Sequence, residues 1–290
     1  MGIRHNLQRS IQNILNNNRT GSYDTQANRR HILFTFAKDI ISAGYGLRGV
    51  NGLKQKHIFV AVRHWQEKEL SVATIKNRMS ALRNLCGIIN KENIVPTNDQ
   101  LGIGKRSYVS LKNRAIHQPD FSKIKDPNVM VSLQLQRLFG LRREESLKIK
   151  PHMADKGDKL ELLSSWCKGG RGRSVPIRTD EQRYWLDRAK QIASDFGQSL
   201  IPERKSYIRH RNAYDKQTLR AGLRNLHGLR HAYAQRRYKE LTNWEAPING
   251  GLTSFEYSRW QKEIDYRARM VLTEELGHSR EQITVNYLGR

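Results

Sequence analysis

Apolar residues recur at helical spacing through the first hundred positions of the chain. The apolar positions that share a face are Leu7, Ile11, Ile14 and Leu15; Ile32, Phe36, Ile40 and Ile41; Ile58, Val62 and Trp65; and Ile75, Met79, Leu82, Leu85 and Ile89. Residues three and four apart lie on one side of an α-helix, so each group predicts one helix with a buried face. Gly44 and Gly46 end the second helix, and Ser71 is a favourable N-cap for the fourth. Residues 1–100 are therefore predicted to form a helical bundle.

The helical pattern weakens between residues 101 and 127, where prolines and glycines interrupt it. Beyond this stretch the predicted elements are a helix over 130–138, strands over 159–163 and 174–177, and helices over 180–196, 207–223 and 226–241. We expect a mainly α chain with a small antiparallel β-sheet. It should have two domains, residues 1–100 and 128–290, joined by a basic linker over 101–127.

The charge balance points to a polyanionic partner. The chain has 52 Lys and Arg against 27 Asp and Glu, a formal net charge of +25. Residues 1–118 hold 19 basic and 6 acidic groups, so the excess is not confined to one tail. Such a chain can displace counterions along a long stretch of DNA. From charge alone, a ribosomal or chromatin-like basic protein is an equally good interpretation.

Basic side chains also lie opposite the apolar faces of the predicted helices. On one helix this is typical of an ordinary solvated face, but its repetition among so few acids favours a DNA-facing surface. The predicted DNA-contacting residues, including those of the linker and of the hairpin turn, are Arg63, Lys76, Arg78, Arg83, Lys105, Arg106, Arg171 and Arg173.

Cysteine usage and hydropathy bear on the compartment. Cys86 and Cys167 are the only cysteines, and no CxxC spacing suggests a zinc site. No apolar run approaches the roughly 20 residues of a membrane span, and the N-terminus lacks the apolar core of a signal peptide. We expect a cytoplasmic, nucleoid-associated protein with no membrane partner and no metal.

Two short patterns place candidate chemistry before and within the predicted hairpin. Arg142 and Glu145, in the segment GLRREESL, are three residues apart and share a helix face. Taken alone, they have the spacing of a surface ion pair. Lys168 begins the run KGGRGR at the hairpin turn, where a lysine can reach a phosphate. Taken alone, this run is typical of a flexible basic loop, and the chain has no GxxxxGK[ST] phosphate-binding loop.

Two further patterns lie in the last third of the chain. His227 and Arg230, in LHGLRH, fall on one helix face, and His278 in LGHS is followed nine residues later by Tyr287. On one straight helix a separation of nine would put His278 and Tyr287 on opposite sides. The chain must therefore turn between them, and Ser279 with Gln282 predicts a capping box for a new helix that carries Tyr287.

In combination and in this order, the patterns resemble the tyrosine recombinase family of the lambda-integrase type. The matching residues are Arg142, Lys168, His227, Arg230, His278 and Tyr287. The resemblance covers residues 128–290 by motif and extends more loosely to the helical half, where residues 74–83 look like the family's core-binding domain. One departure is the long connection of 47 residues between Arg230 and His278, which predicts an insertion near 242–257.

The resemblance implies a role for each of these residues. Arg142 and Arg230 would grip the scissile phosphate with bidentate hydrogen bonds that cannot lose their charge. Tyr287 would attack the phosphorus, with His227 as its general base or orienting partner. Lys168 would protonate the departing 5′ oxygen, and His278 would hydrogen-bond the phosphate. Glu145 and His231 would support these groups without reacting.

The expected activity is site-specific recombination through a 3′-phosphotyrosyl intermediate, which needs no cofactor. The resemblance implies a C-shaped clamp on double-stranded DNA, a homo-tetramer on paired sites and the integration or excision of a mobile element, with accessory DNA-bending proteins a further possible partner. Two alternatives stay open at this point. One is a topoisomerase IB-like nicking and closing enzyme, and the other is a catalytically silent DNA-binding regulator of the same fold.

Overall fold

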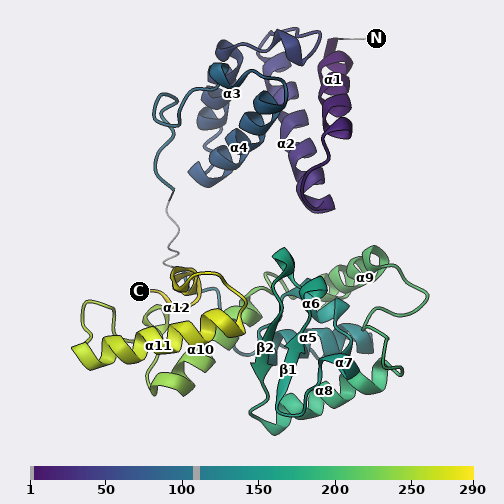
Figure 1. The fold of residues 1–290 in the computed structure, drawn as a ribbon, viewed down its shortest axis with the longest axis vertical. Coiled ribbons are helices and arrows are strands. Elements are labelled where there is room, and N and C mark those ends of the chain that lie inside the picture. Colours follow the sequence, from purple (N-terminus) through teal and green to yellow (C-terminus); the bar gives the residue numbers. More distant parts are fainter. Residues whose placement is uncertain (1–2, 107–111) are drawn as a thin grey trace. The chain divides into compact units, whose positions relative to one another are not determined.

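The computed structural model describes residues 3–106 and 112–290, with side chains from residue 6 onward. The chain divides into two compact units between residues 107 and 108, and each is described by itself. Among the described residues, the α-helices of the N-terminal unit are α1 (Ile3–Asn17), α2 (Tyr23–Ser42), α3 (Gln55–Glu67) and α4 (Val72–Ile88), with 3-10 turns η1 (Val50–Gly52) and η2 (Glu92–Ile94) (Figure 1). The four helices predicted from the apolar pattern are confirmed.

The N-terminal unit is organised around a buried tryptophan. Trp65 of α3 is fully buried and its indole N–H donates to Asp39 of α2 at 2.7 Å. The ring of Phe36 packs against it edge-on, with centroids 6.5 Å apart. Ser71 caps α4 as predicted, because its hydroxyl accepts the backbone N–H of Thr74 at 3.2 Å.

Both ends of the stretch expected to be a linker are packed onto a unit. Leu101 and Ile103 are buried in the N-terminal core, whereas Phe121 and Ile124 are buried in a hydrophobic cluster of the C-terminal unit. Ordered structure therefore reaches well into the range 101–127, and residues 107–111 lie outside the described part of the chain.

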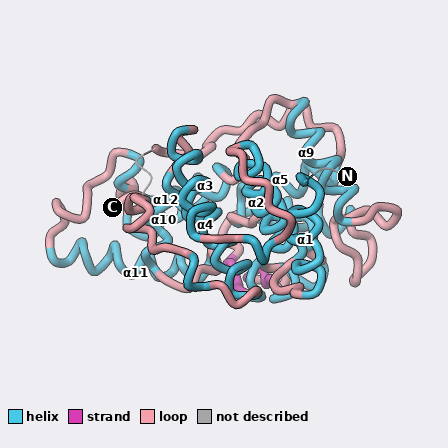
Figure 2. Tube along the Cα trace, turned by 90° about the horizontal axis from the view of Figure 1, so that it is seen from above, coloured by secondary structure: helices cyan, strands magenta, loops and turns pink. Residues whose placement is uncertain are grey.

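The C-terminal unit is helical with one small sheet (Figures 1 and 2). In the described part of this unit, the helices and strands are α5 (Pro127–Phe139), α6 (Arg143–Lys148), α7 (Pro151–Ala154), β1 (Lys159–Leu162), β2 (Arg173–Pro176), α8 (Asp180–Ile192), α9 (Tyr207–Arg220), α10 (Gly228–Thr242), α11 (Arg259–Glu275) and α12 (Val285–Leu288). The 3-10 turns are η3 (Ser164–Trp166), η4 (Lys168–Gly170), η5 (Pro247–Asn249) and η6 (Glu281–Thr284). The predicted fold class, mainly α with a small antiparallel sheet, is confirmed.

Helix α5 is the centre of the C-terminal unit. It packs against α8 on one side and α10 on another, and its Leu135 and Phe139 are fully buried. Strands β1 and β2 pair antiparallel, with Leu160 opposite Val175 in the core. This packing fixes the segments that carry the candidate residues: the turn after α5, the hairpin, the start of α10 and the C-terminal segment.

The connection from α10 to the C-terminus differs in detail from expectation. We expected an insertion near residues 242–257. In the structure α10 ends at Thr242, and residues 243–258 form a loop with η5 before α11 begins. The capping box predicted at Ser279 and Gln282 is wrong. The new turn starts as the 3-10 segment η6 after Arg280, which makes no side-chain cap, and α12 follows with only four residues. No helix of the described residues is long and apolar enough to cross a membrane.

Candidate active site

Arg230 lies at the centre of the predicted site. Helix α10 carries it near its N-terminus, and its side chain is 1% exposed. Its guanidinium donates to the carbonyl oxygens of Gly140, at 2.5 Å, and Leu276, and its Nε atom lies 3.4 Å from the phenolic oxygen of Tyr287. Burial lowers the pKa of Arg230 to about 10, so the group stays charged at neutral pH. Gly140 has φ +62°, and a Cβ there would lie 2.6 Å from the Tyr233 ring, so this turn requires glycine.

Tyr287 and His278 meet at the same point. The Nε2 atom of His278 lies 3.1 Å from the phenolic oxygen of Tyr287 and 3.4 Å from an N–H of Arg230. A guanidinium only donates, so the Nε2 atom of His278 is the acceptor in this arrangement and the phenol can donate to it. The chain does turn between the two residues as predicted: Ser279 and Arg280 are non-helical, with Arg280 extended at φ −150° and ψ 140°, before η6 and α12 begin.

Two more histidine rings pack around Tyr287. The ring centroid of His231 is 4.7 Å from that of Tyr287, and the ring centroid of His227 is 6.2 Å away. We expected His227 to be the direct partner of the tyrosine and His231 only to support the site. In the structure, His231 is the closer ring and His278 makes the hydrogen bond. His227 precedes α10 and stays exposed at the edge of the site.

The electrostatics of the site keep these histidines neutral. Desolvation of the ring and the positive charges of Arg230 and Arg142 lower the pKa of His278 to about 3. The same two causes lower the pKa of His227 to about 4, although this residue keeps an exposed edge. Burial also lowers the pKa of His231 to about 4. At pH 7 each ring is therefore neutral, with one ring nitrogen able to accept a hydrogen bond.

Glu145 joins two arginines beneath the site. It is fully buried, and its carboxylate accepts both the backbone N–H and the guanidinium of Arg142 at 2.7 Å. Arg173 of β2 donates to both carboxylate oxygens, at 3.0 and 2.7 Å. Burial would raise the pKa of Glu145, but the hydrogen bonds and charges of the two arginines outweigh it and hold the pKa at about 2. The carboxylate is thus ionised at neutral pH and fixes Arg142 at the turn before α6.

We expected Arg173 to contact DNA, but the structure places its side chain in the interior. Its side chain is 4% exposed, with the guanidinium bound to Glu145 and the Nε atom donating to the carbonyl of Glu275 at 2.7 Å. It therefore links the hairpin to the end of α11, just before His278. The periodicity of a short strand gave no signal of this buried partner.

Lys168 is not brought to the other five catalytic candidates. It lies in η4, between the two strands, and is exposed. Gly169 and Gly170, which follow it, both have positive φ. No contact between Lys168 and Tyr287 or either arginine is present among the described residues.

The remaining residues expected on a DNA surface fall into two groups. Arg63 of α3 is exposed and Lys76 of α4 is half-buried. Arg78, by contrast, stacks on the Trp65 ring and pairs with Asp39 at 3.6 Å, and Arg83 donates to the Pro96–Asn98 loop. Of the residues expected to contact DNA from the linker and the hairpin turn, those exposed are Lys105, Arg106 and Arg171.

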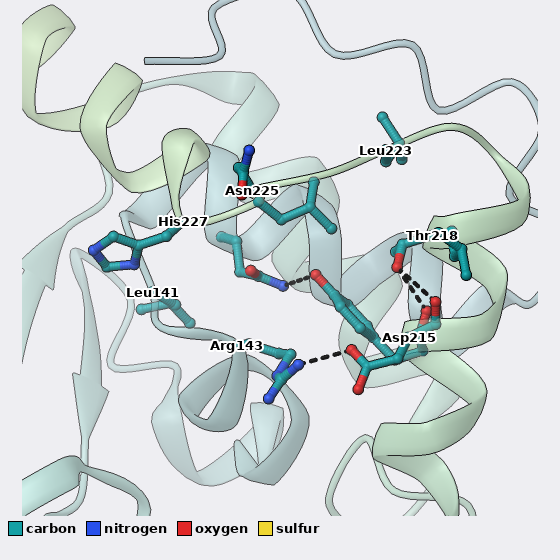
Figure 3. A pocket seen from close by; sticks show the side chains of 11 residues that line it. Leu141, Arg143, Asp215, Thr218, Leu223, Asn225 and His227 are labelled. Atoms are coloured by element: carbon teal, nitrogen blue, oxygen red, sulfur yellow. Dashed lines mark hydrogen bonds and ion pairs between the residues drawn. The ribbon is translucent and has the colours of Figure 1, made fainter. Parts of the chain in front are cut away.

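A cavity of about 500 Å³ adjoins the site at His227 (Figure 3). Its wall is formed by α9 and the segment that leads to α10, and Arg143 crosses it to bond Asp215 of α9 at 2.7 Å. Helix α9 also carries exposed basic side chains that sequence reasoning did not single out: Arg209, Lys216 and Arg220.

Comparison with protein families gives two adjacent matches. Residues 5–95 match the model described as "Phage integrase, N-terminal", and residues 105–236 match the model described as "Integrase". The chain belongs to the integrase family of tyrosine recombinases. The integrase is accordingly a DNA strand transferase that acts in site-specific recombination. The matched residues include Arg142, Lys168, His227 and Arg230, whereas the positions of His278 and Tyr287 follow from the geometry above.

Solved structures share the fold of this integrase at low sequence identity. The Tn1549 transposon integrase in complex with a circular intermediate DNA aligns with a TM-score of 0.57 and 13% identity, covering 100% of this chain and 96% of that one. The XerH site-specific recombinase bound to a palindromic difH substrate aligns with a TM-score of 0.59 and 16% identity, covering 97% and 80%. Comparison with curated proteins gave no match.

Proposed function

We propose that this integrase cuts and rejoins DNA through a 3′-phosphotyrosyl intermediate on Tyr287, and that it integrates or excises a mobile element. One observation carries the proposal. The phenolic oxygen of Tyr287 lies between an arginine N–H, 3.4 Å away on Arg230, and a neutral histidine nitrogen, 3.1 Å away on His278. A nucleophile, a base and a cation at one point suit attack on a phosphodiester.

The cleavage step follows from these contacts. The phenolic oxygen of Tyr287 forms a bond to phosphorus as its proton passes to Nε2 of His278. The bond from phosphorus to the 5′ oxygen breaks, and Lys168, once the connection between the strands reaches the DNA, gives that oxygen a proton. A phenolate leaves more readily than a sugar alkoxide, so the reverse attack by a DNA hydroxyl rejoins the strand with the phosphodiester energy conserved.

The arginines stabilise the charge that develops on the phosphate. Arg142 and Arg230 supply N–H donors that keep their charge, and the buried Glu145 holds Arg142 in position with the help of Arg173. His231 and His227 pack on the Tyr287 ring and limit its movement. Because Tyr287 meets the other groups of its own chain, we infer that each copy cuts with its own tyrosine.

We infer that double-stranded DNA is bound by both units. The relatives with the same fold were solved in complexes with DNA, and both halves of this chain are basic. Exposed Arg63, Lys105 and Arg171, with α9 beside the cavity, supply phosphate contacts. Strand exchange between two sites requires four cuts, so a homo-tetramer on paired sites is the natural assembly. The proposal also includes accessory DNA-bending proteins as partners and the cytoplasmic nucleoid as the place of action.

Two assays run side by side test the reaction class. A plasmid with two candidate sites should yield recombined circles, and a supercoiled plasmid without a site should not be relaxed at a comparable rate. Relaxation without recombination would favour a topoisomerase-like enzyme. Specific DNA binding with neither product would favour a silent regulator. The comparisons favour neither alternative.

A further inference from the structure

Gln235 is a buried glutamine whose hydrogen bonds converge on the nucleophile. It lies on α10 and is 2% exposed. Its Nε2 atom donates to the backbone carbonyl of Tyr287 and to Oδ1 of Asn113, both at 3.0 Å. Its Oε1 atom lies 3.0 Å from Nε2 of His117. None of these contacts involves the groups that react in the proposed mechanism.

The arrangement leaves little freedom in the assignment of donors and acceptors. The carbonyl of Tyr287 can only accept, so the NH₂ group of Gln235 faces it and has its second hydrogen for Asn113. The Oε1 atom must then accept, which makes the Nε2 atom of His117 a donor. A primary amide is the side chain that offers two donors and an acceptor together, and Leu, Met or Glu at this position cannot reproduce the set.

Asn113 and His117 belong to a segment that we name the strap, residues 112–117. It is the first described part of the chain after residue 106, and therefore the path by which the chain enters the C-terminal unit. The backbone N–H of Ile116 donates to the carbonyl of Gly228 at 3.0 Å, and a Cβ on Gly228 would lie 2.4 Å from the carbonyl of Arg114. The strap is thus packed directly on the start of α10.

The segment that carries Tyr287 depends on such outside contacts. Helix α12 has only four residues, which is far too short to be stable by its own hydrogen bonds. On its far side Arg269 donates to the carbonyl of Gly289 at 3.1 Å, and a Cβ on Gly289 would lie 2.9 Å from the backbone of Ile248 in the expected insertion. Asn249 of the same loop lies 3.4 Å from Asn113 of the strap. Between these contacts, the side chain of Gln235 donates directly to the backbone carbonyl of Tyr287 itself.

We propose that Gln235 is a positioning residue that ties the nucleophile to the strap, so that the reach of Tyr287 depends on where the strap lies. This inference rests on the proposed role of Tyr287 as the nucleophile. It also gives the strap and the expected insertion a function beyond connecting elements. Any movement that pulls the strap from α10 withdraws a support from Tyr287 and slows cleavage without removing a reacting group.

The test compares Gln235→Leu with Gln182→Leu in the full chain. Gln182 is an equally buried glutamine of α8, 2% exposed, with three hydrogen bonds of its own, to Leu138, Arg178 and Thr179. Covalent adduct formation is measured on a nicked suicide substrate, together with DNA affinity, thermal unfolding and amide exchange of residues 285–290. We expect Gln235→Leu to form adduct about 100-fold more slowly. Its DNA affinity should be unchanged, and exchange in 285–290 should be faster.

Gln182→Leu separates positioning from general stability. It should lower the unfolding temperature by a similar amount and yet cleave at the wild-type rate below that temperature. A substrate with sulfur at the 5′ bridging position needs no proton for its leaving group. It should not rescue Gln235→Leu, because the defect lies on the nucleophile side. The double variant Asn113→Ala with His117→Ala, which removes only the strap's side of the contact, should also slow adduct formation.

The outcomes of these measurements separate the role of Gln235 from that of the strap and from that of Tyr287. A wild-type cleavage rate for Gln235→Leu, an equal loss in Gln182→Leu, or rescue by the sulfur substrate would overturn the inference. A wild-type rate for the double strap variant would overturn the coupling to the strap. In each case Tyr287→Phe run in parallel shows whether the proposed function stands: no adduct from that variant means that only the role of Gln235 has failed.

Discussion

The phenolic oxygen of Tyr287 lies 3.1 Å from the Nε2 atom of His278, although nine residues separate the two in the sequence. The contact is possible because the chain is non-helical at Ser279 and Arg280, with Arg280 extended, and turns there before η6 and α12 carry Tyr287 back to His278. A buried arginine, Arg230, donates to the same pair. The geometry therefore gives His278 the proton-accepting position that we expected for His227.

Replacing His278 by Phe should remove the acceptor of the phenolic proton. We expect the rate of adduct formation to fall by about 100-fold or more, since proton transfer by a placed side chain contributes 10²–10⁴-fold as a rough range. Affinity for DNA should be retained. His152→Phe is a matched control, because within the described residues His152 contacts the carbonyl of Lys190 at 3.1 Å and none of the groups around Tyr287. Equal rates for both variants would contradict the assignment.

Replacing Glu145 by Gln should destabilise the C-terminal unit. The substitution leaves the buried guanidinium of Arg173 without its counter-charge, which costs about 3 kcal/mol of unfolding free energy by analogy with broken buried ion pairs. Cleavage should also fall, because Arg142 loses its support. Glu144→Gln is the control: its pair with Lys148 is at the surface, and the change should be about 0.5 kcal/mol or less. Chemical denaturation of both variants tests this difference.

Stability should fall in acid in two steps. The pKa of His231 is about 4 and that of His278 about 3 in the folded chain, both below the ordinary value of 6.5. The unfolded chain therefore takes up protons first as pH falls below 6.5, and stability is lost from pH 6.5 down to about 4 for His231 and about 3 for His278. The contribution of Glu145 is present above pH 4.5 and is lost as pH falls toward 2. Denaturation midpoints measured against pH should show a shallower first step in His231→Phe, and an unaltered first step would count against these buried neutral rings.

Cleavage should occur in cis. Tyr287 and Arg142 belong to one site in one chain, so Tyr287→Phe and Arg142→Ala should not complement each other. A mixture of the two variants on a suicide substrate should give no more adduct than either alone, and mixtures of each with wild-type protein supply the control. Adduct restored to a large fraction of the wild-type level would mean that one copy lends its tyrosine to another.

In the N-terminal unit, the effects of two alanine substitutions should distinguish a DNA-contacting arginine from a structural one. Arg63→Ala should lower DNA affinity and reduce the slope of log affinity against log salt by about 1, as expected for one lost phosphate contact. Arg83→Ala should instead lower thermal stability, since Arg83 holds the loop at Pro96 and Asn98. A lower salt slope for Arg83→Ala with none for Arg63→Ala would reverse the assignment.

The sequence predicts the helices well because their apolar spacing is regular. It predicts that Arg142, Arg230, His278 and Tyr287 form one site, because their motifs occur in the order typical of the tyrosine recombinase family. It does not predict that Arg173 is buried against Glu145. The exposure of a side chain in a four-residue strand depends on the elements that pack over it, here α6 and the end of α11. Nor does it predict the role of Gln235. The partners of this side chain are distant in the sequence: Asn113 lies 122 residues before it and Tyr287 lies 52 residues after it. Contacts of that range depend on the packing of the strap and α12 against α10.

The most direct test of the account is to trap the protein on a nicked suicide DNA and to map the modified residue by mass spectrometry. We predict one phosphotyrosyl peptide, with the DNA fragment on Tyr287 and none formed by Tyr287→Phe. A covalent adduct on another residue, or an undiminished adduct in Tyr287→Phe, would contradict the central claim.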